Sequence, residues 1–78
     1  MYKIQRSDYA YGCTSMKYCY QDSIESALKV FENYKKTIMM TCCPGHVYTV
    51  IIQSDEDTLR EYSLDLTIPE NIEIYVQP

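Results

Sequence analysis

Four cysteines and one histidine are the residues of this chain whose types are best suited to chemistry: Cys13, Cys19, Cys42, Cys43 and His46. Thiolates and imidazoles bind zinc, which takes four such ligands in a tetrahedral site. Structural zinc sites usually use two closely spaced ligand pairs, whereas here the first two cysteines are six positions apart and the next two are adjacent. Adjacent residues of a strand also point to opposite faces of a sheet. The spacing favours free, partly buried thiols, and no cofactor is expected.

Cys43 and His46 flank a Pro44-Gly45 turn, where a thiol and an imidazole can approach each other. A nucleophilic Cys–His pair needs an activated thiol and usually a third group that orients the imidazole. No obvious third group lies nearby in the sequence. Catalysis is therefore not expected, and a small Cys/His metal- or thiol-dependent module is kept as an alternative function.

Acidic residues are concentrated in the last third of the chain. Residues 55–78 hold seven of the eleven acids and one base, a formal charge of −6, while residues 1–54 hold six bases and four acids, a formal charge of +2. Grouped charges of one sign steer association with a partner of the opposite sign. The sequence therefore predicts an acidic partner-binding surface. Its expected residues are Asp55, Glu56, Asp57, Glu61, Asp65, Glu70 and Glu73, with Tyr62 and Tyr75 nearby.

Other kinds of site are disfavoured by composition. Residues 55–57 lack the twelve-residue spacing and central glycine of a calcium-binding loop. Two glycines in the whole chain are too few for a phosphate-binding glycine loop. Direct nucleic-acid binding needs a basic stripe, and the net charge is −4.

Tyrosine is unusually frequent, with nine Tyr against one Phe and no Trp. Its rigid ring and polar tip suit binding surfaces. Tyr2, Tyr18, Tyr34, Tyr48 and Tyr62 fall on apolar patterns and are core candidates, whereas the other four have less obvious burial. A tyrosine-filled core and a tyrosine-rich binding surface are both compatible with this pattern.

The clearest element is a helix predicted over residues 23–36. Apolar residues recur there with helical spacing, and Asp22 with Glu25 forms a D-x-x-E capping box at its start. Alternation or β-propensity predicts strands elsewhere. The predicted strand segments are residues 2–6, 14–20, 37–42, 46–53, 59–66 and 72–76.

These elements predict an α+β fold of order β-β-α-β-β-β-β, an antiparallel sheet of five to six strands with one helix packed on one face. A length of 78 residues fits a single domain over residues 1–78. The N-terminus has no signal-peptide pattern and no apolar run approaches the length of a membrane span, so a cytoplasmic protein is expected.

The run from Tyr2-Lys3-Ile4 through residues 22–28 to residues 47–53 resembles small acidic orphan proteins of phages and mobile elements, among them anti-CRISPR proteins. The resemblance rests on size, charge and a β-β-α-β-β element order. It implies a protein that inhibits a host nucleic-acid-binding defence complex through protein–protein contact.

The leading hypothesis is therefore a non-catalytic inhibitor whose acidic surface docks on a basic protein partner, with no direct nucleic-acid or membrane binding. A structural subunit is a further alternative to the Cys/His module. In that case strands 47–53 and 72–76 would pair across chains in a homodimer, so both a monomer and a homodimer are considered.

Overall fold

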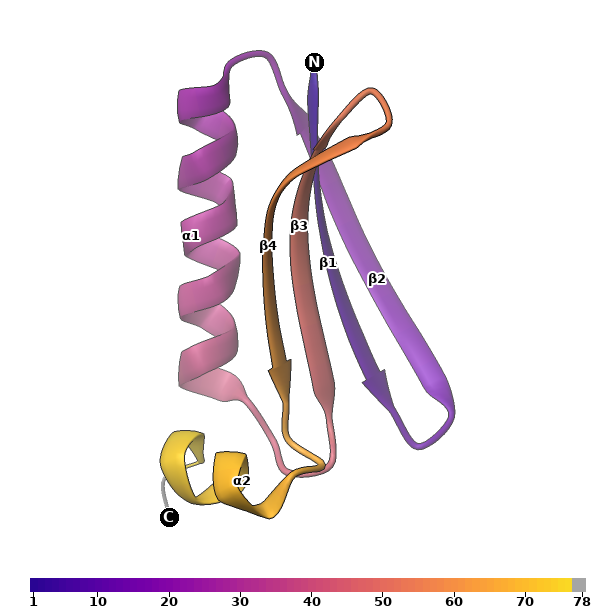
Figure 1. Cartoon of the computed structure of the whole chain (residues 1–78), viewed down its shortest axis with the longest axis vertical. Coiled ribbons are helices and arrows are strands. Elements are labelled where there is room, and N and C mark those ends of the chain that lie inside the picture. Colours follow the sequence, from indigo (N-terminus) through magenta and orange to yellow (C-terminus); the bar gives the residue numbers. More distant parts are fainter. Residues whose placement is uncertain (77–78) are drawn as a thin grey trace.

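Four antiparallel strands and two helices make up residues 1–76, which are the residues that the computed structural model describes. In chain order they are β1 (Tyr2–Ala10), β2 (Cys13–Gln21), α1 (Ile24–Thr41), β3 (Val47–Ser54), β4 (Asp57–Asp65) and α2 (Pro69–Tyr75). The strands form one sheet in the order β2-β1-β3-β4. Helix α1 runs along one face of this sheet, and the short α2 lies at one end of the molecule (Figure 1).

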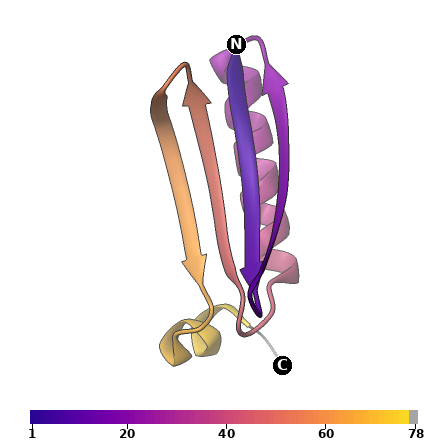
Figure 2. The same ribbon diagram turned by 90° about the vertical axis from the view of Figure 1, so that its right-hand side faces the viewer.

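The hydrophobic core lies between α1 and the sheet. Strand alternation places Ile4, Val50 and Ile52 on the face that α1 covers, where all three are fully buried. The helix contributes Phe31 and Ile38, whose spacing of seven residues keeps them on one stripe. Figure 2 shows α1 behind the sheet and no element in front of it. The described chain therefore buries one face of the sheet and leaves the other face open.

Two tight turns set the strand register. Tyr11 and Gly12 both have positive φ, at 53° and 80°, as a two-residue type I′ hairpin loop requires. The loop between β3 and β4 begins with Asp55, also at positive φ. A third turn follows α1, where Gly45 has a φ of 88° after Pro44 and the His46 N–H donates to the Cys43 carbonyl at 3.4 Å, as in a type II turn.

The predicted sheet of five to six strands with a single helix is wrong, because two of the six predicted strands are helical. Residues 37–42 were expected as a strand, yet α1 continues to Thr41. The hydroxyls of Thr37 and Thr41 donate to the carbonyls four residues earlier, at 2.9 and 2.7 Å, a hydrogen bond that threonine can form inside a helix. Ile38 extends the buried stripe beyond the predicted end at Lys36 and outweighs the local β-propensity.

The second wrong strand covers residues 72–76, where the structure has α2. Pro69 occupies the first turn of this helix, a position that its fixed φ favours. Ile72 and Val76 pack against the core while Ile74 is exposed, so the contacts follow a spacing of four rather than two. Three apolar residues at alternate positions fit both periods, which explains the error.

The start of α1 also differs in detail from the prediction. Ser23, not Asp22, is the N-cap, and its hydroxyl accepts the backbone N–H of Ser26 at 3.2 Å. Serine and aspartate are equally good caps, so the pattern could not separate two neighbouring candidates.

The continuation of α1 can be tested with two substitutions. Ile38→Val should lower the free energy of unfolding by about 0.5–1.5 kcal/mol, because Ile38 is fully buried. Met40→Ala should change it by less than about 0.5 kcal/mol, because Met40 is exposed. Urea unfolding followed by circular dichroism measures both. A strand over residues 37–42 would bury positions 38 and 40 together, so equal losses for the two variants would contradict the helix.

Candidate protein-binding surface

The predicted acidic residues follow β4 and its two flanking connections. Residues 55–57 form the tip of the β3–β4 hairpin, Glu61 lies in the middle of β4, and Asp65 ends it. Glu70 and Glu73 belong to α2. Figure 1 places the hairpin tip and α2 at opposite ends of the long axis, whose extent is 38 Å. The acids therefore form a strip along one edge of the sheet instead of a compact patch, and this strip is called the acidic edge below.

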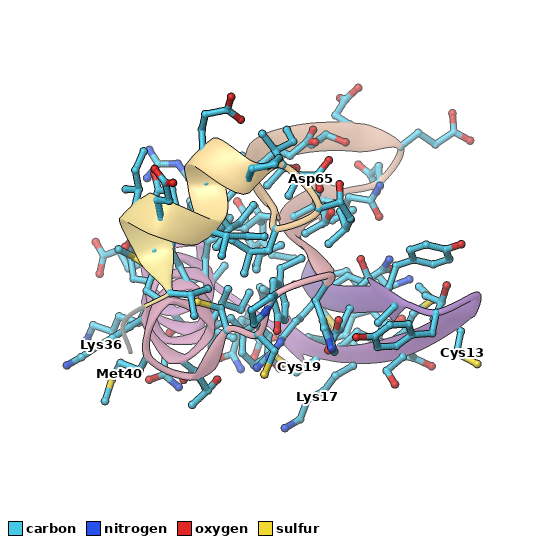
Figure 3. All side chains as sticks on the ribbon, turned by 90° about the horizontal axis from the view of Figure 1, so that it is seen from below. Cys13, Lys17, Cys19, Lys36, Met40 and Asp65 are labelled. Carbon is cyan, nitrogen blue, oxygen red and sulfur yellow. The ribbon has the colours of Figure 1, made fainter. Side chains whose placement is uncertain are left out.

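Most side chains of the acidic edge are solvent-exposed, and none has an ion partner in the described part of the chain. Asp55, Glu56, Asp57 and Glu61 are all exposed. Within residues 1–76, the one salt bridge joins Asp8 and His46, outside this edge. Seen from below, Lys17 and Lys36 lie on the side of the molecule away from Asp65 (Figure 3). The charge asymmetry of the sequence is thus preserved in space.

Tyr62 does not contribute to the exposed surface of the acidic edge. It pairs with Val50 on the face of the sheet that α1 covers, and its ring packs beneath the Lys35 ammonium, 5.0 Å from the ring centroid. Its hydroxyl is buried and has no hydrogen-bond partner within residues 1–76. Burial, followed by the proximity of Tyr75 and Cys42, raises the pKa of Tyr62. Tyr62 is therefore half-buried and packs against the core.

Asp65 is fixed by a local turn. Its carboxylate accepts the Thr67 hydroxyl at 2.5 Å and the Thr67 backbone N–H at 2.9 Å. These two hydrogen bonds lower the pKa of Asp65, since they stabilise its charged form. The carbonyl of Asp65 accepts the Asn71 amide at 2.9 Å, which joins the end of β4 to α2. Asp65 therefore holds a negative charge in place and connects β4 to α2.

Helix α2 carries the last predicted residues, and all of them are exposed: Glu70, Glu73 and Tyr75. The helix is held to the end of α1 by the Cys42 thiol, which donates to the Tyr75 carbonyl at 3.6 Å. Beside the acids lie Ile68 and Ile74, which are 42% and 61% exposed. This end of the acidic edge therefore combines negative charge with accessible apolar surface.

The cysteines and the histidine do not form one cluster. Figure 3 shows Cys13 at the far end of the β1–β2 hairpin and Cys19 near α1. Cys42 contacts α2, and the Cys43 thiol donates to the Thr41 carbonyl at 3.6 Å. No three His, Cys, Asp or Glu side chains among the described residues gather into a group that could hold a metal ion.

His46 has a partner that its sequence neighbours did not suggest. Its Nδ1 lies 2.9 Å from Asp8 Oδ1 on β1, and its ring stacks on Tyr48 with centroids 5.7 Å apart. The Tyr48 hydroxyl accepts the backbone N–H of Cys43 at 3.0 Å. Asp8 thus orients the imidazole as in a catalytic pair, but the Cys43 thiol points to Thr41 and the arrangement holds the turn after α1.

A tyrosine-rich strip on the open face of the sheet was missed. Tyr9, Met16, Tyr18 and Tyr20 are each 51–58% exposed there, although Tyr18 was a core candidate. The Tyr18 and Tyr20 rings meet edge-on at 6.0 Å, and the Lys3 ammonium lies 4.9 Å from the Tyr18 centroid. Alternation along residues 14–20 places Met16, Tyr18 and Tyr20 on one face of the sheet, but the sequence alone does not show which face α1 covers.

No protein-family model, curated protein sequence or solved structure matches the chain. Neither α1 nor α2 is long and apolar enough to cross a membrane, and they are the helices that residues 1–76 contain.

The assignment of Tyr62 to the core leads to a stability prediction. Tyr62→Phe should raise the free energy of unfolding by roughly 1 kcal/mol, because it removes a buried hydroxyl that lacks a partner and keeps the ring under Lys35. Urea unfolding measures the change, and Tyr75→Phe on the exposed face of α2 is the control with little expected effect. A clear loss of stability for Tyr62→Phe would show that the hydroxyl is hydrogen-bonded.

The Asp65–Thr67 turn leads to a prediction about pH. The pKa of Asp65 in the folded chain lies below the ordinary value of 3.8, so its contribution to stability is present above about pH 3.8 and is lost as the pH falls through the folded pKa. Thr67→Val removes the hydroxyl donor and keeps the backbone N–H, so the Asp65 pKa should rise part of the way to its ordinary value.

Carboxyl-carbon NMR titration of Asp65 measures this change directly. Thr14→Val on β2, remote from Asp65, serves as a matched substitution and should leave the titration unchanged. An unaltered Asp65 titration in Thr67→Val would show that the hydroxyl does not stabilise the carboxylate.

Proposed function

We propose that this chain is a non-catalytic binding protein whose acidic edge docks on a basic, nucleic-acid-binding surface of a protein partner and blocks that surface. The observation behind the proposal is the uncompensated negative charge along β4, its hairpin tip and α2. Six of the seven acids of the acidic edge have exposed side chains. Within residues 1–76, none of the seven forms a salt bridge.

Spacing along β4 adds to this argument. Glu61 and Asp65 point to the same face of the strand and are four residues apart, which corresponds to about 13 Å. Phosphates along a nucleic-acid strand are also regularly spaced negative charges, so a basic groove that binds them can accept a rigid row of carboxylates. The hydrogen bonds to Asp65 keep one of these carboxylates in a fixed position.

Composition of the edge favours a protein partner over a nucleic acid. Its one base, Arg60, lies among seven acids, so the edge repels phosphate. The exposed Ile68, Ile74 and Tyr75 at the α2 end give apolar contact area of the kind that protein interfaces bury. The resemblance to anti-CRISPR proteins in size and acidity points to CRISPR effector complexes, whose guide–target channel is basic.

The test is inhibition of DNA binding by guide-loaded CRISPR effector complexes. Each complex of a panel is mixed with labelled target DNA, and fluorescence anisotropy records DNA binding as the chain is added. Excess chain should suppress DNA binding by at least one effector, with a steep salt dependence. The triple variant Glu56→Lys, Glu61→Lys, Glu73→Lys should weaken this inhibition at least about tenfold, because it reverses charges along the whole edge.

A matched control distinguishes the effect of charges on the acidic edge from the effect of net charge. The variant Asp22→Lys, Glu25→Lys, Glu32→Lys makes three reversals of +2 each, and so also changes the net charge from −4 to +2, but its sites are exposed positions in and before α1. It should inhibit like the unmodified chain, with circular dichroism confirming that both variants fold. Equal losses for the two triples, or no inhibition of any effector, would contradict the proposal.

A further inference from the structure

The two edges of the sheet differ in how well they are protected against pairing with another strand. At the β4 edge the register shifts between Ile52 and Gln53, which leaves Leu59 as the extra residue of a bulge. Acids at Asp57, Glu61 and Asp65 are distributed along the same strand. Bulges and charges are the devices that keep edge strands from pairing with other chains. The β4 edge is therefore protected.

The β2 edge has no bulge and one charged residue, so it is less protected. All nine of its residues pair with β1 in unbroken register, and no strand within residues 1–76 pairs with its other side. Lys17 is its one charged residue, and it contains no proline. Seven of its nine side chains are exposed, among them Met16, Tyr18 and Tyr20, so it combines β-forming residues with accessible apolar surface. Figure 2 shows β2 at the outer side of the sheet with one face uncovered.

We propose that β2 is a homodimerisation edge: it pairs antiparallel with β2 of a second copy across a two-fold axis and forms a continuous eight-stranded sheet. A nine-residue edge is long for a strand, so the pairing offers many backbone hydrogen bonds. This interface differs from a homodimer built on residues 47–53 and 72–76, because β3 is a central strand and residues 69–75 are helical.

The side chains of β2 select the register of this pairing. With Lys17 on the axis, two ammonium groups would stand directly opposite each other, which is unfavourable. With Tyr18 on the axis, Lys17 lies opposite Cys19 of the second copy, and Tyr20 lies opposite Met16 of the second copy. The tyrosine and methionine side chains of both copies then form one continuous strip on the open face, where aromatic cross-strand pairs stabilise a sheet.

Charge explains why the assembly closes at two copies. In the dimer both β4 edges lie at the outer ends of the joined sheet, and their acids repel further chains. Pairing of β2 with β4 of another copy would extend without limit, but the bulge at Leu59 interrupts the matching hydrogen-bond ladder. The proposal stands independently of the partner of the acidic edge, which remains accessible in the dimer.

Analytical ultracentrifugation of the full chain, from micromolar to millimolar concentration under reducing conditions, tests the proposal. The unmodified chain should shift from monomer towards twice the monomer mass. Tyr18→Lys should raise the dimer dissociation constant at least about tenfold, because it places two ammonium groups opposite each other on the axis. Met16→Lys, at an equally exposed site of β2, should weaken dimerisation in the same direction.

Tyr9→Lys is the matched control, since Tyr9 is exposed to a similar degree on the same face but belongs to β1, one strand inside the edge. It should leave the dissociation constant nearly unchanged. Circular dichroism checks that each variant folds. The proposal would be overturned if the chain stays monomeric throughout or assembles beyond two copies. It would also be overturned if Tyr9→Lys and Tyr18→Lys weaken the dimer equally, because equal losses would indicate face-to-face packing.

Discussion

The packing of α1 against one face of the sheet is the interaction on which the rest of this structure depends. Phe31 and Ile38 of the helix meet Ile4, Val50 and Ile52 of the two central strands, and these residues form most of the buried core. One helix can cover one face of a four-stranded sheet and no more. An exposed second face and two free edges are therefore consequences of this arrangement, and the remaining sequence determines the charge and polarity of each.

These free surfaces differ in charge and in strand regularity. The edge of β4 is acidic and bulged, the edge of β2 is nearly uncharged and regular, and the open face is rich in tyrosine on the β1–β2 side. The turn around His46 joins the two halves, because Asp8 of β1 holds the imidazole and Tyr48 of β3 holds the backbone of Cys43. Surfaces of opposite character are thereby held at opposite edges of one rigid sheet.

Much of this arrangement could be predicted from local patterns, and the failures have specific physical causes. The first hairpin, the start of α1 to within a residue, and the positions of β3 and β4 follow from alternation, capping and turn residues. Residues 37–42 have β-branched side chains whose preference is overridden by the burial of Ile38. Residues 72–76 contain too few apolar positions to distinguish a period of two from a spacing of four.

The acidic segment was predictable because charge is visible in composition, whereas the inward direction of Tyr62 depends on which face α1 covers. The pairing of Asp8 with His46 depends on the approach of β1 to β3, since 38 positions separate the two residues. The exposure of Tyr18 has the same origin. Local patterns therefore identified most elements and the acidic edge, but contacts between distant strands determine which side chains are exposed on the surface.

The proposed dimer requires that the two edges of the sheet have opposite tendencies, with β2 open to pairing and β4 protected from it. Amide hydrogen exchange, measured residue by residue by NMR at increasing protein concentration, tests this claim most directly. Alternate amides of β2, those that point away from β1, should become slower to exchange as concentration rises, while the amides of residues 60–65 in β4 should keep the same rates. Concentration-dependent protection at β4 with unchanged rates in β2 would contradict it.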